Sequence, residues 1–488
     1  MARTLKDNTG AEDGRPDPDG AAGLLQSTVK VTTGNLASRI TGLMRVLAVA
    51  AALGATFLGN TYQSANLVSN LLFELLAAGI LSSVLVPPFV ELLDAGRRDE
   101  AEDIAGGFLG LGLVVLGVVC LCGILARTWI MQALTVAVPD PAVRAAEIRL
   151  GSFLLILFVP QVLLYAVGTV ATALLHGGRR FTAVAFAPVA NNVIVIATMG
   201  VFWAISGGGG GVVEGAAGLD LSTAQKLVLA VGTTAGVAAM SLLPLVDVWR
   251  AGIRLRPRWD PRHPQIRALA RSGAWGAAYL ALGQVLVATT LVLANQVEGG
   301  VVAYQIAFTL FLLPHALLAQ PLITVLYPRL AAEAVGRQWQ SFAKTLAKGG
   351  QWVIFLTAPA TAFLVAAAAP ALHLVRFGRL DAAGSDLVAR VAVGYALGVV
   401  GYACFLLLTR ASYAAGDTRA PALVNLAVTI GGSIAMLAAF AAASGSDKVV
   451  VLGFAYSAAV TSGAVLLSIV VRRRAREPSP VGRALARA

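Results

Sequence analysis

Long runs of apolar residues follow one another along almost the whole chain, and short polar connections separate them. A helix needs roughly 20 mostly apolar residues to span about 30 Å of hydrocarbon. By that measure the pattern predicts an all-α polytopic membrane protein with about twelve transmembrane helices. The apolar runs start near residues 27, 61, 103, 148, 181, 227, 268, 300, 348, 386, 420 and 449.

Composition agrees with a membrane protein. The 488 residues are 57% hydrophobic and 13% charged, with a mean hydropathy of +0.78, whereas about a quarter of the residues in a soluble domain are charged. Residues 1–26 are rich in Gly, Pro and Asp, so we expect a disordered tail that is not a signal peptide. The net charge of +12 fits basic rims that contact anionic membrane lipids and does not indicate a nucleic-acid partner.

Lysine and arginine concentrate in every second connection, beginning with the one that holds Arg97 and Arg98. Cytoplasmic loops carry the excess of these residues. We therefore expect both termini on the cytoplasmic side of the membrane. The connection that holds Arg376, Arg379 and Arg390 is an exception to this pattern.

The two halves of the chain contain similar patterns. Pro88 and Gly96 follow the second apolar run, and Pro328 and Gly336 follow the eighth run at the same spacing. Two six-helix lobes around a cavity are typical of transporters that work by alternating access. The predicted units are the tail at 1–26, an N-terminal lobe at 27–250, a basic cytoplasmic linker at 251–264, a C-terminal lobe at 265–474 and a cytoplasmic tail at 475–488.

Arg39 and Arg45 lie inside the first apolar run. An arginine at mid-bilayer costs a few kcal/mol, so such residues face a protein interior or a wet cavity. We interpret them as a site for anions, because guanidinium pairs well with phosphates and carboxylates. Six residues apart, they point about 120° from each other on a straight helix. The alternative is that one of them, Arg45 in particular, pairs with an acid such as Glu74.

Three polar residues of the second run are further candidates for the cavity. Asn66 and Asn70 lie one turn apart on one helix face, where they would line the cavity or form hydrogen bonds between helices. Glu74 is an acid inside the membrane, so it would carry a coupling proton or form an ion pair with Arg39 or Arg45.

Several motifs resemble a known family. Ser38-Arg39-Ile-Thr-Gly42-Leu-Met-Arg45, the run from Ala65 to Pro87, and the region from Phe377 to Pro421 are similar, in this order, to signatures of the MurJ/MviN lipid II flippases. These flippases belong to the multidrug/oligosaccharidyl-lipid/polysaccharide exporter superfamily, and the resemblance covers roughly Thr28 to Arg474. High Ala, Gly and Arg usage suggests a diverged member of actinobacterial type.

The resemblance implies a fold, a location and a function. It implies a V-shaped protein of two lobes in the bacterial cytoplasmic membrane. Such a protein moves lipid II, the undecaprenyl-diphosphate-linked peptidoglycan precursor, from the inner to the outer leaflet, and cell-wall synthesis proteins are expected partners. Arg39 and Arg45 match cavity arginines of the family.

The chain also departs from the family pattern. Uncharged residues stand at cavity positions that usually carry an acid or an arginine. Asn425 and Thr429 match places where some members bind sodium, so Na⁺, H⁺ and the membrane potential all remain open as the coupling force. The uncharged replacements are Thr61, Phe73, Phe308 and Thr309.

Two classes of function follow from the residues. One is a flippase for lipid II or for another polyprenyl-linked glycolipid. The other is a membrane scaffold or regulator of cell-envelope assembly that transports nothing. The retained Arg39 and Arg45 favour the flippase, because a scaffold need not maintain costly charges in lipid. The sequence contains no candidate nucleophile or cluster of metal ligands, so we expect no enzyme activity, no catalytic residue, no metal site and no cofactor.

Overall fold

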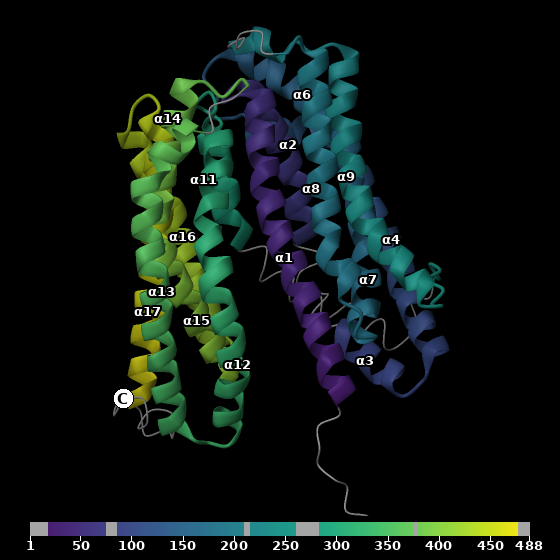
Figure 1. The fold of residues 1–488 in the computed structure, drawn as a ribbon. Coiled ribbons are helices and arrows are strands. Elements are labelled where there is room, and N and C mark those ends of the chain that lie inside the picture. Colours follow the sequence, from purple (N-terminus) through teal and green to yellow (C-terminus); the bar gives the residue numbers. More distant parts are fainter. Residues whose placement is uncertain (1–17, 75–84, 209–214, 260–282, 375–377, 477–488) are drawn as a thin grey trace, which may run out of the picture.

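The computed structural model describes residues 18–74, 85–208, 215–259, 283–374 and 378–476. These residues form two bundles of helices that meet at one end and lie apart at the other, so that the molecule is V-shaped (Figure 1). The first lobe contains α1 (Pro18–Leu53), α2 (Phe57–Phe73), α3 (Val86–Asp94), α4 (Arg98–Leu125), α5 (Arg127–Leu134), α6 (Pro141–Phe158), α7 (Gln161–Gly177), α8 (Thr182–Ile205), the 3-10 turn η3 (Gly215–Leu219) and α9 (Thr223–Arg250).

The second lobe begins with a short apolar helix, Gly283–Ala294. It continues with α11 (Gly300–Pro314), the π-helical turn η4 (His315–Ala319), α12 (Gln320–Val335), α13 (Trp339–Leu374), α14 (Ala382–Ala396), α15 (Val399–Ala414), α16 (Arg419–Ala442) and α17 (Asp447–Arg476). The start of α1 and the end of α17 lie at the end of the molecule where the two lobes are apart (Figure 1).

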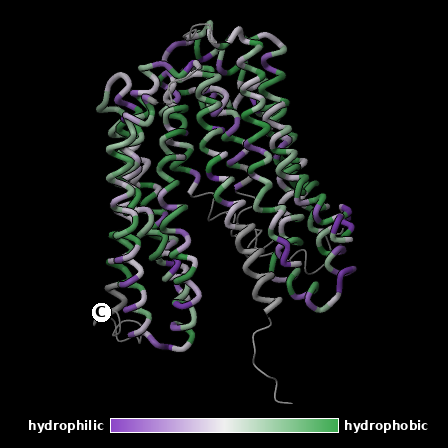
Figure 2. The backbone as a smooth tube through the Cα atoms, viewed as in Figure 1, coloured by the Kyte–Doolittle hydropathy of each residue, from purple (hydrophilic) through white to green (hydrophobic). Residues whose placement is uncertain are grey.

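The helices match the predicted apolar runs. Within the described ranges, nine helical segments are long and apolar enough to cross a membrane, and the bent pair of α14 and α15 makes a tenth. Hydrophobic residues cover most of their length, and hydrophilic residues gather toward the ends (Figure 2). The runs that start near 61 and 268 pass through residues 75–84 and 260–282, which lie outside the described residues. The polytopic helical fold is therefore confirmed, whereas the count of twelve stays a prediction.

Two helix starts differ from the predicted ones. Helix α1 begins at Pro18, so residues 18–26 are helical rather than part of the tail, and proline is well suited to a first helical turn. Helix α6 begins at Pro141, where the Asp140 side chain accepts hydrogen bonds from the Ala142 and Val143 amides at 2.8 and 3.4 Å. This earlier start places Glu147 inside the fourth span instead of in the loop before it.

The internal repeat is visible in the fourth span of each lobe. In the first lobe this span is divided into α6 and α7 at Pro160. In the second lobe the corresponding span is divided into α14 and α15 at Gly398, with a bend of 41°. Two residues after each divided span the backbone is left-handed, at Arg179 with φ 57° and at Gly416 with φ 77°.

The basic linker lies against α4 in the part that the structure describes, residues 251–259. The Arg254 amide donates to Glu102 Oε1 at 2.8 Å, and the Arg258 amide donates to Gly106 O at 2.9 Å. Glycine permits this approach, because a Cβ at Gly106 would lie 2.4 Å from the carbonyl oxygen of Arg256. This part of the linker is therefore bound to the first lobe.

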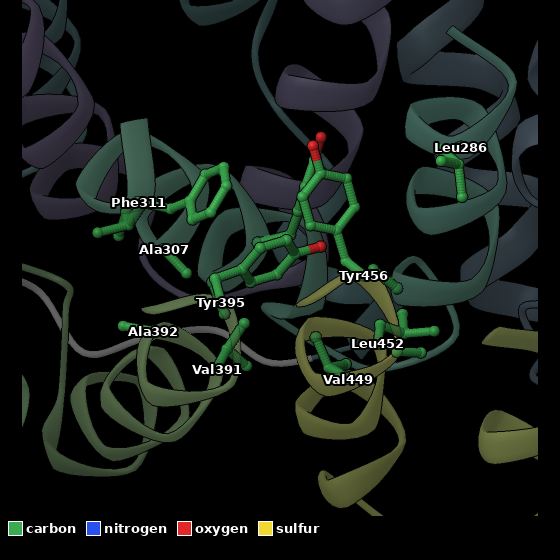
Figure 3. Close-up of a cluster of buried hydrophobic side chains, with 14 of the residues drawn as sticks. Leu286, Ala307, Phe311, Val391, Ala392, Tyr395, Val449, Leu452 and Tyr456 are labelled. Carbon is green, nitrogen blue, oxygen red and sulfur yellow. The ribbon is translucent and has the colours of Figure 1, made fainter. Parts of the chain in front are cut away.

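The second lobe has an aromatic core between α11, α14 and α17. Phe311, Tyr395 and Tyr456 pack their rings together, with centroids 5.2 to 6.1 Å apart. Aliphatic side chains of the same helices surround them, together with Leu286 of the helix Gly283–Ala294 (Figure 3). The first lobe has its own separate cores, in which Tyr62 and Phe158 are almost fully buried. Each lobe thus has a packed core, and the core of the second lobe extends to Val46 and Ala50 of α1.

Backbone and amide contacts join the two lobes at what we call the closed end. The buried side chain of Asn60 donates from Nδ2 to Val297 O at 2.9 Å and accepts at Oδ1 from the Val301 amide at 3.0 Å. Gly299 has φ +72°, and a Cβ there would lie 2.4 Å from the carbonyl oxygen of Ala55. The backbones of the two lobes are therefore in direct contact at this end.

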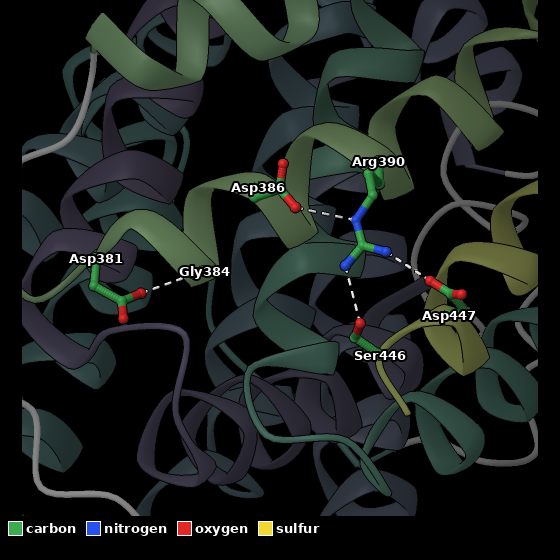
Figure 4. A network of polar contacts seen from close by, with 6 residues as sticks. All are labelled: Asp381, Gly384, Asp386, Arg390, Ser446 and Asp447. Carbon is green, nitrogen blue, oxygen red and sulfur yellow. Dashed lines mark hydrogen bonds and ion pairs between the residues drawn. The ribbon is translucent and has the colours of Figure 1, made fainter. Parts of the chain in front are cut away.

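The arginines that break the predicted charge pattern lie at this closed end. The Arg379 amide donates to Ala51 O at 2.7 Å, across the two lobes. Arg390 pairs with Asp386 at 3.2 Å and with Asp447 at 2.6 Å, and it donates to Ser446 Oγ at 2.9 Å (Figure 4). Neighbouring acids therefore balance the charge of Arg390. Arg376 lies outside the described residues.

Candidate functional site

Helix α1 is fixed against α8 in the segment between its two arginines. Asn192 of α8 donates from Nδ2 to Thr41 Oγ1 at 3.0 Å and to Ser38 O at 3.3 Å. Residues four apart share a helix face, so Arg45 lies on the same side of α1 as Thr41. Arg39 lies on another face, where it is exposed.

Arg45 lines a small cavity between the lobes. Asn66 and Asn70 come from α2 of the first lobe, and Gln305 comes from α11 of the second. The volume of about 20 Å³ is enough for about one water molecule. In this conformation the cavity does not hold a substrate head group, so binding one there requires the walls to move. The lining residues are Arg45, Val46, Val49, Tyr62, Gln63, Asn66, Leu67, Asn70, Val195 and Gln305.

One nitrogen of the Arg45 guanidinium, Nε, is buried and lacks a hydrogen-bond partner. Leaving a buried donor unpaired costs about 1–3 kcal/mol. Among the ion pairs of the described residues, none joins Arg45 or Arg39 to Glu74. In the structure, therefore, Glu74 does not neutralise either arginine. None of the ion pairs within the described residues involves Arg45.

Arg39 lies on α1 about 9 Å farther from the closed end than Arg45, at a rise of about 1.5 Å per residue. Its side chain is exposed. The two arginines therefore stand at successive depths along α1 rather than around one point.

The two asparagines of α2 lie where the sequence predicts them. Asn66 is 9% exposed and lines the cavity. Asn70 also lines it, and its Oδ1 accepts a hydrogen bond from the Tyr165 hydroxyl at 3.3 Å. Asn70 thus does both things that the sequence left open, since it borders the cavity and bonds to another helix.

Glu74 takes a different place. It caps the C-terminal end of α2, is exposed, and accepts a hydrogen bond from Gln284 Nε2 of the second lobe. It does not line the cavity around Arg45. The structure therefore brings Arg45, Asn66 and Asn70 together and sets Glu74 apart from them.

The candidate sodium residues lie in the second lobe. Thr429 of α16 is buried, and Asn425, one turn earlier, is half-buried. Neither lines the cavity around Arg45. In the part of the chain that the structure describes, no three or more His, Cys, Asp or Glu residues gather as metal ligands would. A role of Asn425 and Thr429 in ion coupling stays a prediction.

The uncharged replacements have structural partners. Phe308 packs against the rings of Tyr304, Tyr395 and Tyr456, with centroids 5.5 to 5.8 Å apart. Thr309 donates from Oγ1 to Gln305 O at 2.8 Å. The side chain of Phe73 lies outside the described part of the structure. At these positions of the second lobe, ring packing and a helix hydrogen bond stand in place of charge.

The remaining replacement, Thr61, leads to residues that sequence reasoning missed. Its Oγ1 lies 3.0 Å from Oε1 of Glu147, a fully buried acid of α6. The other oxygen, Oε2, accepts a hydrogen bond from Asn295 Nδ2 of the second lobe at 3.1 Å. The sequence signal that could have identified Glu147 is the proline at 141. A fourth span that begins at Pro141 contains Glu147 as an acid within the membrane.

A family model described as "Lipid II flippase MurJ" matches residues 49–485. The match begins after Arg45. Two curated relatives are each 26% identical to this chain. The probable lipid II flippase MurJ of Rhizobium meliloti aligns over 444 residues, which are 88% of this chain and 78% of the relative. The lipid II flippase MurJ of Burkholderia cenocepacia aligns over 424 residues, 83% and 76% of the two proteins.

Solved structures agree on the fold. A lipid II flippase MurJ in an inward closed conformation superposes with a TM-score of 0.74 at 16% identity, covering 91% of this chain and 87% of the other. An inward-facing multidrug resistance transporter of the MATE family superposes with a TM-score of 0.68 at 11% identity, covering 92% and 96%. This chain therefore shares its two-lobed fold with both proteins.

Proposed function

The chain belongs to the MurJ family, and on that premise we propose that it moves lipid II from the inner to the outer leaflet of the bacterial cytoplasmic membrane. One observation carries the proposal. Arg45 is an arginine between two lobes of a transporter fold, and its buried Nε has no partner. The diphosphate and the peptide carboxylates of lipid II are anions that suit such a group. No bond is made or broken in this reaction, so the protein acts as a transporter and not as an enzyme.

The spacing of the arginines suggests how the head group advances. A guanidinium forms two parallel hydrogen bonds to a phosphate and does not lose its charge, and the attraction is stronger where the effective dielectric constant is low. Arg39 is exposed and lies nearer the end where the lobes are apart. The diphosphate therefore meets Arg39 first and Arg45 about 9 Å deeper.

Alternating access follows from the closed end. We place the closed end outside the cell and the opposite end, with both termini and most basic connections, in the cytoplasm. The head group enters from the cytoplasmic side, and the bonds of Asn60 to the second lobe prevent it from leaving outward. Outward release requires these bonds to break while the lobes part, which also widens the cavity around Arg45.

Translocation in cells tests the proposal. Cells depleted of their own lipid II flippase receive wild-type protein, Arg45→Ala or Arg149→Ala at matched expression, and outer-leaflet lipid II is measured. Arg149 is an exposed arginine of the same lobe that does not line the cavity, so it is the matched control. We expect wild type and Arg149→Ala to restore outer-leaflet lipid II and Arg45→Ala to fail.

Two results would contradict the proposal. Wild-type protein that is expressed and folded but leaves lipid II inside would favour the scaffold or another glycolipid. Arg45→Ala that restores lipid II as well as wild type would remove the cavity from the mechanism. The separate roles of Na⁺, H⁺ and the membrane potential are measured in the same cells by collapsing each gradient in turn.

A further inference from the structure

Glu147 is a fully buried acid that bridges the two lobes at the closed end. It belongs to α6 of the first lobe, and Thr61 of α2 contacts its Oε1 at 3.0 Å. Asn295 of the second lobe donates to its Oε2 at 3.1 Å. Nothing in the transport mechanism described so far uses this residue.

Counting protons shows which form of Glu147 these contacts fit. The Thr61 hydroxyl carries one hydrogen, and its oxygen also lies 2.8 Å from Phe57 O, a carbonyl that can only accept. When Thr61 donates to that carbonyl, the contact with Glu147 is a hydrogen bond only if the carboxyl group donates to Thr61. Protonated Glu147 satisfies every contact, since it donates from Oε1 and accepts from Asn295 at Oε2.

The surroundings also favour the protonated form. Helices α2, α5 and α9 and the turn η3 pack against α6, and the connection that contacts Glu147 through Asn295 carries another acid, Glu298. Arg144, one turn earlier on α6, forms no ion pair with Glu147 within the described structure. A buried carboxylate without a cation is costly, so the group takes up a proton instead.

The bridge exists only while the lobes touch. Asn295 and Glu298 belong to the connection before α11, and Glu298 Oε1 accepts from the Phe57 and Gly215 amides of the first lobe at 3.4 and 3.3 Å. When the lobes part, Asn295 moves away from Glu147 and water reaches the carboxyl group. A glutamate exposed to water is ionised at neutral pH.

We propose that Glu147 is a proton-binding site. When Glu147 is protonated, the two lobes stay in contact at the closed end, and when it is ionised they separate. The ligand is a proton from the side of the membrane onto which this end opens. Because the closed form binds one more proton than the open form, acid favours closure and a rise in pH favours opening. This inference rests on the alternating access proposed above. It adds a proton as the ligand that sets the ratio of open to closed molecules.

The ratio of open to closed molecules can be measured through the distance between the two lobes. Spin labels at Ala142 and Ser444, both exposed near the closed end, report the open and closed populations in lipid vesicles between pH 5 and pH 9. The three native cysteines, Cys120, Cys122 and Cys404, are first replaced by alanine. For one proton we expect the ratio of open to closed molecules to rise by up to about tenfold per pH unit.

Three variants decide which group is responsible. Glu147→Gln keeps both hydrogen bonds without an ionisable proton, so we expect it to stay closed at every pH. Glu298→Gln and Asp386→Asn remove other acids of the same end. We expect the closed fraction of both variants to remain pH-dependent, with the midpoint of Glu298→Gln at lower pH than in wild type because a negative neighbour is removed. The proposal fails if wild type shows no pH dependence, if Glu147→Gln keeps it, or if Glu298→Gln abolishes it.

A further variant tests the proposal if Glu147→Gln does not fold. Asn295→Ala removes the bond from the second lobe and leaves Glu147 intact, so we expect a smaller closed fraction than wild type at pH 5. An unchanged closed fraction in Asn295→Ala overturns the proposal. Because the readout is a distance and not lipid II, failure here leaves the proposed transport function standing.

Discussion

The two lobes share an arrangement of helices but differ in what they present between them. The first lobe contributes Arg39, Arg45 and two asparagines of α2. The second lobe contributes Gln305 to the cavity, and behind it Phe308 and its neighbours form an aromatic core. Charge is thus concentrated on one side of the cavity.

This difference indicates different functions for the two lobes. Buried arginine is costly and is retained where it binds something, whereas a packed aromatic cluster contributes stability through its buried area and ring geometry. We infer that the first lobe recognises the anionic head group and that the second is the rigid wall that moves against it. Substitutions of the cavity residues in the first lobe should therefore impair transport, and substitutions in the aromatic core of the second should impair folding.

The largest effect is expected in the aromatic core. Phe311→Ala should destabilise the protein by about 3–5 kcal/mol, because it leaves a cavity among buried rings. Thermal unfolding in lipid-containing detergent measures this. The control is Phe363→Ala, since Phe363 is 70% exposed on α13 and should change the unfolding midpoint little. Equal destabilisation by the two variants would show that the aromatic core has no special part in stability.

The second largest effect is expected at the closed end. Gly299→Ala combines a left-handed backbone, which costs about 1–2 kcal/mol, with overpacking against Ala55 O, which costs about 1–3 kcal/mol. We expect a loss of the closed population in the spin-label experiment. Gly445→Ala carries only the backbone strain, because Gly445 has φ +55° and open space around it. A closed population in Gly299→Ala that matches the control would contradict the tight contact between the lobes.

A third prediction separates stability from transport in the first lobe. Arg45→Met removes a buried donor without a partner, so it should stabilise the protein by about 1–3 kcal/mol while abolishing translocation of lipid II. Arg39→Met should impair translocation without this gain in stability, because Arg39 is exposed. A lower unfolding midpoint in Arg45→Met would mean that Arg45 is a structural residue.

The smallest effect is expected at the edge of the cavity. Tyr165→Phe removes the hydrogen bond to Asn70 Oδ1, which is worth about 0.5–1.5 kcal/mol. We expect a small decrease in the unfolding midpoint and a modest decrease in translocation, measured as above. A loss of transport as complete as that of Arg45→Met would make Tyr165 part of the recognition site itself.

Much of the fold could be predicted from the sequence because a membrane protein must satisfy its backbone within helices. Hydropathy alone therefore locates the spans, and the Pro88 and Pro328 echo indicates the two lobes. Helix starts were predicted less well. The first turns of α6 are amphipathic, so the apolar run near residue 148 begins later than the helix, which starts at Pro141.

The site could be predicted only in part. The cost of charge in lipid singles out Arg39 and Arg45, and helical spacing groups Asn66 with Asn70. Which acid meets which partner depends on how helices from distant parts of the chain pack. Glu74 therefore bonds to Gln284 instead of an arginine, and the meeting of Glu147 with Asn295 across the lobes could not be read from either run.

Binding of lipid II to the purified protein tests the central claim most directly. Native mass spectrometry compares wild type with Arg45→Ala in the first lobe and Phe308→Leu in the second. A hydrogen bond to a charged group is worth about 1.5–3 kcal/mol, so Arg45→Ala should weaken binding about ten- to a hundredfold, while Phe308→Leu should bind as wild type does. Unchanged binding in Arg45→Ala, or an equal loss in both variants, would contradict the assignment of recognition to the first lobe.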